Sequence, residues 1–77
     1  MKTLVLHARW FDHELRLRLS EETAAKIESD PIEAVNDDLD RARYGVSPRN
    51  LSVGQCRKVR NFFAPGNINY FDSAEIL

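Results

Sequence analysis

Residues 14–19 read ELRLRL, a strict alternation of charged side chains with leucines. A two-residue period places the leucines on one face of an extended strand, whereas a helix would scatter them around its axis. The preceding segment follows the same period, with apolar side chains at Leu4, Leu6, Ala8 and Trp10. Two alternating segments joined by a short turn near residues 11–13 predict a β-hairpin with one apolar face.

Three helix starts follow the hairpin. Ser20 is placed as an N-cap, and the two glutamates after it suit the positive end of a helix dipole. Asp30 and Pro31 end this first helix, because the residue before a proline is displaced from the helical conformation. They also begin a second helix, with Asp30 as its cap and Pro31 at its first position. Ser52 and Gln55 have the spacing of a capping box and predict a third helix.

The remaining signals complete the topology. Gly45 is expected to end the second helix in a left-handed conformation. After the Pro-Gly break at residues 65–66, the alternation in INYF, residues 68–71, predicts a third strand that joins the hairpin. The tail after it is expected either to fray or to dock. The order β-β-α-α-α-β predicts a single α+β domain, residues 1–77, with three helices on one face of a small antiparallel sheet.

Size and cysteine content narrow the class of protein. A chain of 77 residues forms one core, with a margin of stability of about 3–5 kcal/mol that leaves room for a homodimer or a permanent partner. The one cysteine, Cys56, excludes an internal disulfide, and the N-terminal apolar run is too short for a signal peptide or a membrane span. We therefore expect a cytoplasmic protein. Cys56 shares a helical stripe with Val59 and Phe63, which predicts a buried, unreactive thiol instead of a nucleophile.

Motifs for catalysis are absent from the sequence. The sequence has three glycines in all and contains neither a phosphate-binding glycine loop nor a nucleophile elbow. His7, Asp12, His13 and Glu14 lie near the expected hairpin turn, but their spacing is not typical of a metal site. We interpret them as exposed polar residues and predict a protein without enzymatic activity, metal or cofactor.

Charge is segregated along the chain, although the net charge is only −1. Residues 20–40 hold one lysine and eight acids, a balance of −7: Glu21, Glu22, Glu28, Asp30, Glu33, Asp37, Asp38 and Asp40. Residues 41–60 hold no acid and six bases, a balance of +6: Arg41, Arg43, Arg49, Arg57, Lys58 and Arg60. Such bipolarity indicates either two recognition surfaces or two elements that neutralise each other, as Asp37 and Arg41 are spaced to do within one helix.

Protein binding explains this segregation with the fewest assumptions. At helical spacing Glu33, Asp37 and Asp40 fall on one flank of the second helix, where they form a ridge that attracts arginine-rich surfaces. Such a ridge can imitate a phosphate backbone toward a nucleic-acid-handling protein, or it can be a solvated face that keeps a small domain soluble. Adjacent Trp10 and Phe11 point to opposite faces of a strand, so one of them is expected to be an exposed interface anchor. The leading hypothesis is a small adaptor or inhibitor, of the kind that phages and mobile elements encode, that occupies the surface of a larger protein.

The alternative hypothesis is a DNA- or RNA-binding regulator. Its basic helix would present Arg57, Lys58 and Arg60 to phosphates. In addition, ELRLRLSEETAAKIE, residues 14–28, resembles the opening of ribbon-helix-helix repressors. The resemblance implies a two-stranded ribbon shared by two copies, with Glu14, Arg16 and Arg18 facing the major groove. The Asp30-Pro31 break and the extra strand before the ribbon depart from that family.

Overall fold

The two alternating segments pair as the predicted hairpin. In the computed structural model, which describes residues 1–8, 13–63 and 71–77, β1 (Lys2–His7) and β2 (Glu14–Leu19) are antiparallel neighbours. Leu4 lies opposite Leu17 and Leu6 lies opposite Leu15, so the leucines of both strands share the buried face. The hairpin thereby supplies one apolar surface for the rest of the chain.

The third strand lies later in the chain than the sequence pattern predicts. Residues 68–70 of the predicted strand are outside the described residues, and Phe71, which is described, is not in a strand. The strand that joins the hairpin is β3 (Ser73–Ile76), antiparallel to β1, which gives the sheet order β2-β1-β3. The tail therefore docks on the sheet and does not fray.

Each helix begins at the cap that the sequence predicts. The Ser20 side chain accepts a hydrogen bond from the Thr23 amide, and the Asp30 side chain accepts one from the Glu33 amide. Ser52 and Gln55 form the full capping box, in which each side chain bonds the other residue's backbone N–H. The resulting helices are α1 (Glu21–Ile27), α2 (Pro31–Arg43) and α3 (Val53–Phe62).

Gly45 ends α2 as predicted. Its φ of 75° is a left-handed conformation that other residues adopt only with strain. The Gly45 N–H donates to the Ala42 carbonyl at 3.2 Å, and the Val46 N–H donates to the Arg41 carbonyl at 2.8 Å. This pair of bonds is a Schellman motif, and it directs the chain into the loop of residues 46–52.

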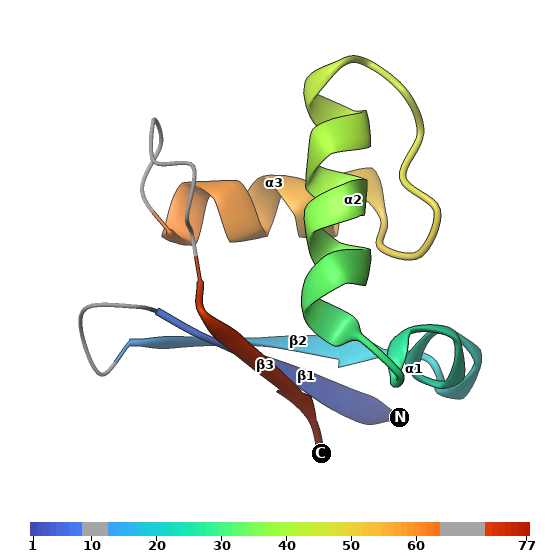
Figure 1. The fold of residues 1–77 in the computed structure, drawn as a ribbon, viewed down its shortest axis with the longest axis vertical. Helices are drawn as coiled ribbons and strands as arrows, with labels where there is room; N and C mark the ends of the chain where they lie inside the picture. The colour runs from blue at the N-terminus through green and yellow to red at the C-terminus, as the bar shows by residue number, and fades with distance from the viewer. Residues whose placement is uncertain (9–12, 64–70) are drawn as a thin grey trace.

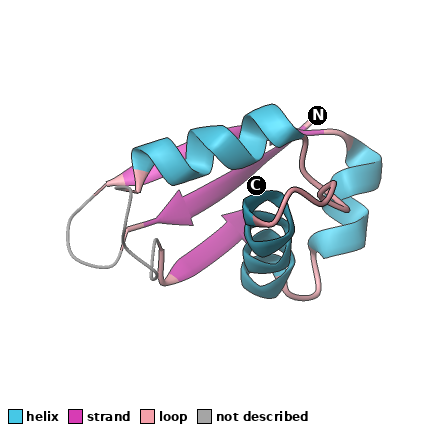
Figure 2. Cartoon of the chain, turned by 90° about the horizontal axis from the view of Figure 1, so that it is seen from above, coloured by secondary structure: helices cyan, strands magenta, loops and turns pink. Residues whose placement is uncertain are grey.

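The helices cover one face of the sheet, as the α+β prediction requires. α3 lies over β2, while α2 stands over β3 with its N-terminal end next to the sheet and its C-terminal end far from it (Figures 1 and 2). α1 packs against β1 and β2 at one end of the sheet. One hydrophobic core joins the helices to the sheet. Its members are Leu4, Leu6, Leu15, Leu17, Leu19, Ala24, Ile27, Val35, Leu39, Leu51, Cys56, Val59, Phe63 and Phe71.

The other face of the sheet carries the alternate residues. Val5, at its centre, is buried but does not belong to the core cluster. Its neighbours across the strands, Arg16 and Glu75, are exposed. Among the described residues, no helix is both long and apolar enough to cross a membrane.

Candidate functional site

Helix α2 presents the predicted acidic ridge on its outer side. Glu33, Asp37 and Asp40 are all exposed, and steps of four and three residues keep them in line along the helix. Tyr44, the C-cap residue, continues the same line and is 77% exposed. The acidic ridge, defined as Glu33, Asp37 and Asp40, therefore faces solvent and ends beside an exposed aromatic ring.

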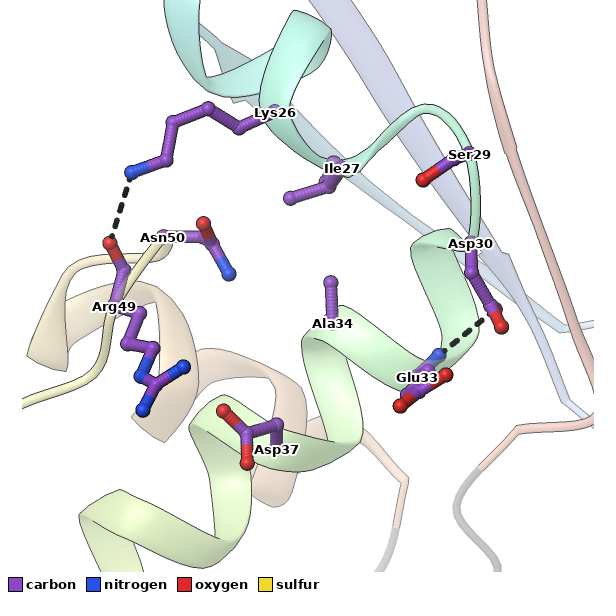
Figure 3. Close-up of a pocket in the computed structure, with 9 residues that line it drawn as sticks. All are labelled: Lys26, Ile27, Ser29, Asp30, Glu33, Ala34, Asp37, Arg49 and Asn50. Carbon is purple, nitrogen blue, oxygen red and sulfur yellow. Dashed lines mark hydrogen bonds between the residues drawn. The ribbon is translucent and has the colours of Figure 1, made fainter.

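A cleft of about 490 Å³ lies beside the acidic ridge, between α1, α2 and residues 49–50 (Figure 3). Ile27 and Ala34 provide its apolar lining. Two ridge carboxylates, Glu33 and Asp37, line the cleft from α2. The ridge is thus one wall of a concave surface, which suits the insertion of a partner's side chain.

Two cations and one further acid line the same cleft. Lys26 comes from α1, and its Nζ donates to the Arg49 carbonyl oxygen at 3.4 Å, which ties α1 to the loop before α3. Arg49 contributes its own side chain to the lining, and Asp30 lies at the start of α2. The cleft therefore holds three carboxylates and two cations, an excess of negative charge.

Asp38 is the acid of α2 whose role the charge count does not reveal. It is fully buried, and its carboxylate accepts the backbone N–H of Arg49 at 2.8 Å, of Asn50 at 3.0 Å and of Leu51 at 2.7 Å. Asp38 therefore adds to the acidic count of residues 20–40 but not to the acidic surface. A signal for its burial exists in the sequence, because Val35, Asp38 and Leu39 share one helical stripe.

Arg41 also differs from its sequence-based assignment. Its Nε donates to the Ser47 carbonyl at 2.9 Å, so this guanidinium holds the loop after α2 instead of neutralising Asp37. The ion pairs found within the described ranges join Met1 to Glu21, His7 to Glu75, and Arg16 to Glu14. None of them involves the acidic ridge.

The basic helix does not pair with the acidic one. Arg57 and Lys58 are exposed on the outer side of α3, and Arg60 is half-buried. In the part of the chain that the structure describes, no ion pair joins these three residues to the acidic ridge. Acidic and basic surfaces therefore both remain outward.

The residues that would contact DNA according to the ribbon-helix-helix resemblance lie on the open face of the sheet. Glu14, Arg16 and Arg18 are exposed, and Arg16 Nε lies 2.6 Å from Glu14 Oε2. However, β2 pairs with β1 of the same chain along its whole length. Within this chain, β2 is therefore the edge strand of a three-stranded sheet, whereas the resemblance implies a strand that pairs with a second copy.

The histidines near the hairpin do not converge on one site. His7 Nε2 lies 3.5 Å from Glu75 Oε1, whereas the ring of His13 meets Phe62 edge-on with centroids 6.5 Å apart. Asp12 is outside the described residues, as are Trp10 and Phe11, the predicted interface anchors. Within the described ranges, no three His, Cys, Asp or Glu side chains are placed to hold a metal ion.

Cys56 is buried on the inner side of α3, as predicted. Its Sγ lies 3.9 Å from the Asp38 carbonyl oxygen, to which the thiol donates. Burial and the negative charge of Asp38 raise the pKa of this thiol to about 11, against a weaker opposing effect of Arg60. Because the reactive thiolate is disfavoured, Cys56 is unsuited to nucleophilic chemistry.

Comparison of the chain with protein-family models, with curated proteins and with solved structures found no significant match in any of the three.

Proposed function

We propose that this chain is a non-catalytic protein-interaction module, an adaptor or inhibitor that binds a larger protein through the acidic ridge and the cleft beside it. The observation that carries the proposal is the unpaired state of the ridge. Glu33, Asp37 and Asp40 are exposed, and among the described residues no base forms an ion pair with them, although six bases follow in residues 41–60.

The geometry favours a partner with a basic surface. Carboxylates spaced by one helical turn repeat negative charge along a line, and complementary charge speeds association and fixes orientation. The cleft offers Glu33 and Asp37 to a guanidinium, with the apolar surface of Ile27 and Ala34 beside them for its aliphatic stem. A protein that normally binds nucleic acid meets these requirements, because its binding surface is rich in arginine.

Capture from host lysate tests this proposal, with nuclease treatment to remove bridging nucleic acid. The test variant is Glu33→Lys/Asp37→Lys/Asp40→Lys. Its matched control, Glu14→Lys/Glu22→Lys/Asp72→Lys, makes the same charge change at exposed positions elsewhere. We expect wild type and control to retain one protein partner that the ridge variant loses. Equal capture of that partner by the ridge variant would refute the proposed role of the ridge.

One observation favours a second function, nucleic-acid binding by α3. Arg57 and Lys58 are exposed and, within the described ranges, form no ion pair, on a helix whose first turn contains no acid. The variant Arg57→Glu/Lys58→Glu leaves half-buried Arg60 in place. Nucleic acid recovered with wild type and lost with this variant, together with a steep dependence on salt, would support α3 as the binding element.

A further inference from the structure

The two edges of the sheet differ in how their backbone groups are used. On the β2 edge, Gln55 Nε2 donates to the Arg18 carbonyl at 3.0 Å, so a side chain of α3 occupies part of that edge. β3 is the opposite edge, and within the described residues no other strand adjoins its outer side. A free strand edge is a template for another strand.

The hydrogen bonds of β3 show which groups are free. Thr3 and Leu77 exchange both backbone bonds, at 3.2 and 2.8 Å. The direction of the backbone N–H and C=O groups alternates along a strand, so those of Glu75 also point toward β1. Those of Ala74 and Ile76 therefore point to the outer edge. The free edge thus offers two donors and two acceptors in the spacing of a β-ladder.

A groove of about 430 Å³ lies beside this edge. Ala74 and Ile76 line it from β3, and Ala24, Ala25 and Pro31 line it from the helical side. These side chains are short or rigid, so the space between them suits one aliphatic side chain. The side chains of Ala74 and Ile76 are on the core face, and an added strand would direct alternate residues into the groove.

The charged residues that line the groove indicate which kind of binding partner is favoured. Glu21, Glu28 and Glu75 line it with one cation, Lys2, and Glu28 has no ion pair among the described residues. A second copy of the chain is disfavoured, because the antiparallel register that joins the outward groups of Ala74 in one copy to those of Ile76 in the other would place Glu75 opposite the same residue of the other copy. Like charges in directly opposite positions destabilise a strand pair.

We propose that the free edge of β3 and its groove bind an extended segment of a partner protein as a fourth strand. An aliphatic side chain of that segment enters the groove, and a lysine or arginine lies opposite Glu75. This mode is β-strand addition, in which the backbone supplies affinity and alternate side chains supply specificity. The site is separate from the acidic ridge.

Peptide binding to the full chain provides the test. The probe is a fluorescein-labelled TVKVTV peptide, whose valines face the groove and whose lysine faces Glu75, and the control peptide carries glutamate in place of that lysine. We expect fluorescence anisotropy to show saturable binding of the lysine peptide, and amide shifts at Ala74 and Ile76 in NMR spectra. Absence of both effects at millimolar peptide would overturn the proposal.

A charge swap tests the assignment of Glu75. Glu75 is exposed, so Glu75→Lys should leave the fold intact. We expect this variant to bind the lysine peptide about tenfold more weakly and the glutamate peptide correspondingly more tightly. An unchanged preference between the peptides would exclude Glu75 as the determinant of specificity.

Further measurements distinguish peptide binding at the β3 edge from binding at the acidic ridge and from dimerisation. Ala74→Pro removes an outward N–H without removing a bond to β1, so it should abolish peptide binding while circular dichroism remains that of wild type. The ridge variant Glu33→Lys/Asp37→Lys/Asp40→Lys should bind the peptide as wild type does. Concentration-dependent dimerisation in sedimentation experiments, with shifts at Ala74 and Ile76, would instead assign the edge to a second copy and contradict the proposal.

Discussion

The inner and outer sides of α2 use the same amino acid in opposite ways. Asp37 and Asp38 are adjacent, yet Asp37 is exposed and Asp38 is fully buried under the loop that leads to α3. The Asp38 carboxylate accepts hydrogen bonds from three backbone N–H groups, whereas no hydrogen bond or ion pair of the Asp37 side chain is found within the described ranges. Surroundings, and not residue type, therefore decide whether an acid of this helix maintains the fold or is available to a partner.

Substitution of Asp38 should have the largest effect. Asp38→Ala leaves the backbone N–H groups of Arg49, Asn50 and Leu51 without their acceptor, at a cost of about 3–5 kcal/mol. That cost equals the whole expected stability of about 3–5 kcal/mol, so about half of the variant molecules should be unfolded at room temperature. Circular dichroism and urea denaturation measure the loss.

Two controls make this expectation decisive. Asp38→Asn keeps one acceptor oxygen and should lose about 2–3 kcal/mol, which leaves a measurable transition. Asp37→Ala, one residue away, should change the free energy of unfolding by less than about 0.5 kcal/mol. Similar losses for Asp37→Ala and Asp38→Ala would show that the two sides of the helix do not differ.

Alkaline pH should lower the stability of the fold through Cys56, a buried residue of α3 that contacts the Asp38 carbonyl on α2. The pKa of this thiol is about 11 in the folded protein and 9.0 without its surroundings. Between these pH values the unfolded chain has lost the proton that the folded chain retains, so stability is fully present below pH 9.0 and falls as the pH rises toward 11. The loss should approach about 2–3 kcal/mol.

Cys56→Ala isolates this contribution, because the variant lacks the thiol but keeps every other group that titrates. The difference in unfolding free energy between wild type and Cys56→Ala, measured in urea at a series of pH values, should shrink as the pH increases. A difference that stays constant across the interval would contradict the raised pKa.

Asp30 combines features of the two residues, because it is exposed like Asp37 but has a structural role like Asp38. Its side chain accepts the Glu33 N–H at 3.1 Å as the cap of α2. Asp30→Ala should cost about 1 kcal/mol, while Asp30→Ser, which keeps a capping oxygen, should restore most of that stability. A cost as small as that of Asp37→Ala would mean that the cap contributes little to this helix.

Local signals explain how much of this fold is predictable from sequence. The caps at Ser20, Asp30 and Ser52 and the turn at Gly45 depend on residues within one helical turn, and all four are confirmed. The alternation of residues 14–19 likewise fixes which face of β2 is buried. These elements were predictable because their stabilising contacts lie close together in sequence.

Features that depend on distant contacts were not predictable. Asp38 stands in a buried helical stripe, but the amides that it binds are 11 to 13 residues away. The SAEI segment of β3 has little strand propensity of its own, and it pairs because β1 has a free side. The apolar run Leu4-Val5-Leu6, buried throughout, is a signal that β1 is the central strand.

The smallest effect on stability is expected from the acidic ridge itself. Asp37→Asn/Asp40→Asn removes two exposed charges at nearly constant volume, and it should change the free energy of unfolding by less than about 0.5 kcal/mol in urea denaturation. The same variant should retain less partner than wild type in lysate capture, because it leaves only Glu33 charged in the ridge. A stability loss above about 1 kcal/mol would place these carboxylates with Asp38 as structural groups. An unchanged free energy of unfolding with reduced capture would instead show that these carboxylates contribute to binding. The outer side of α2 would then differ from the inner side in the way that the contacts of Asp37 and Asp38 imply.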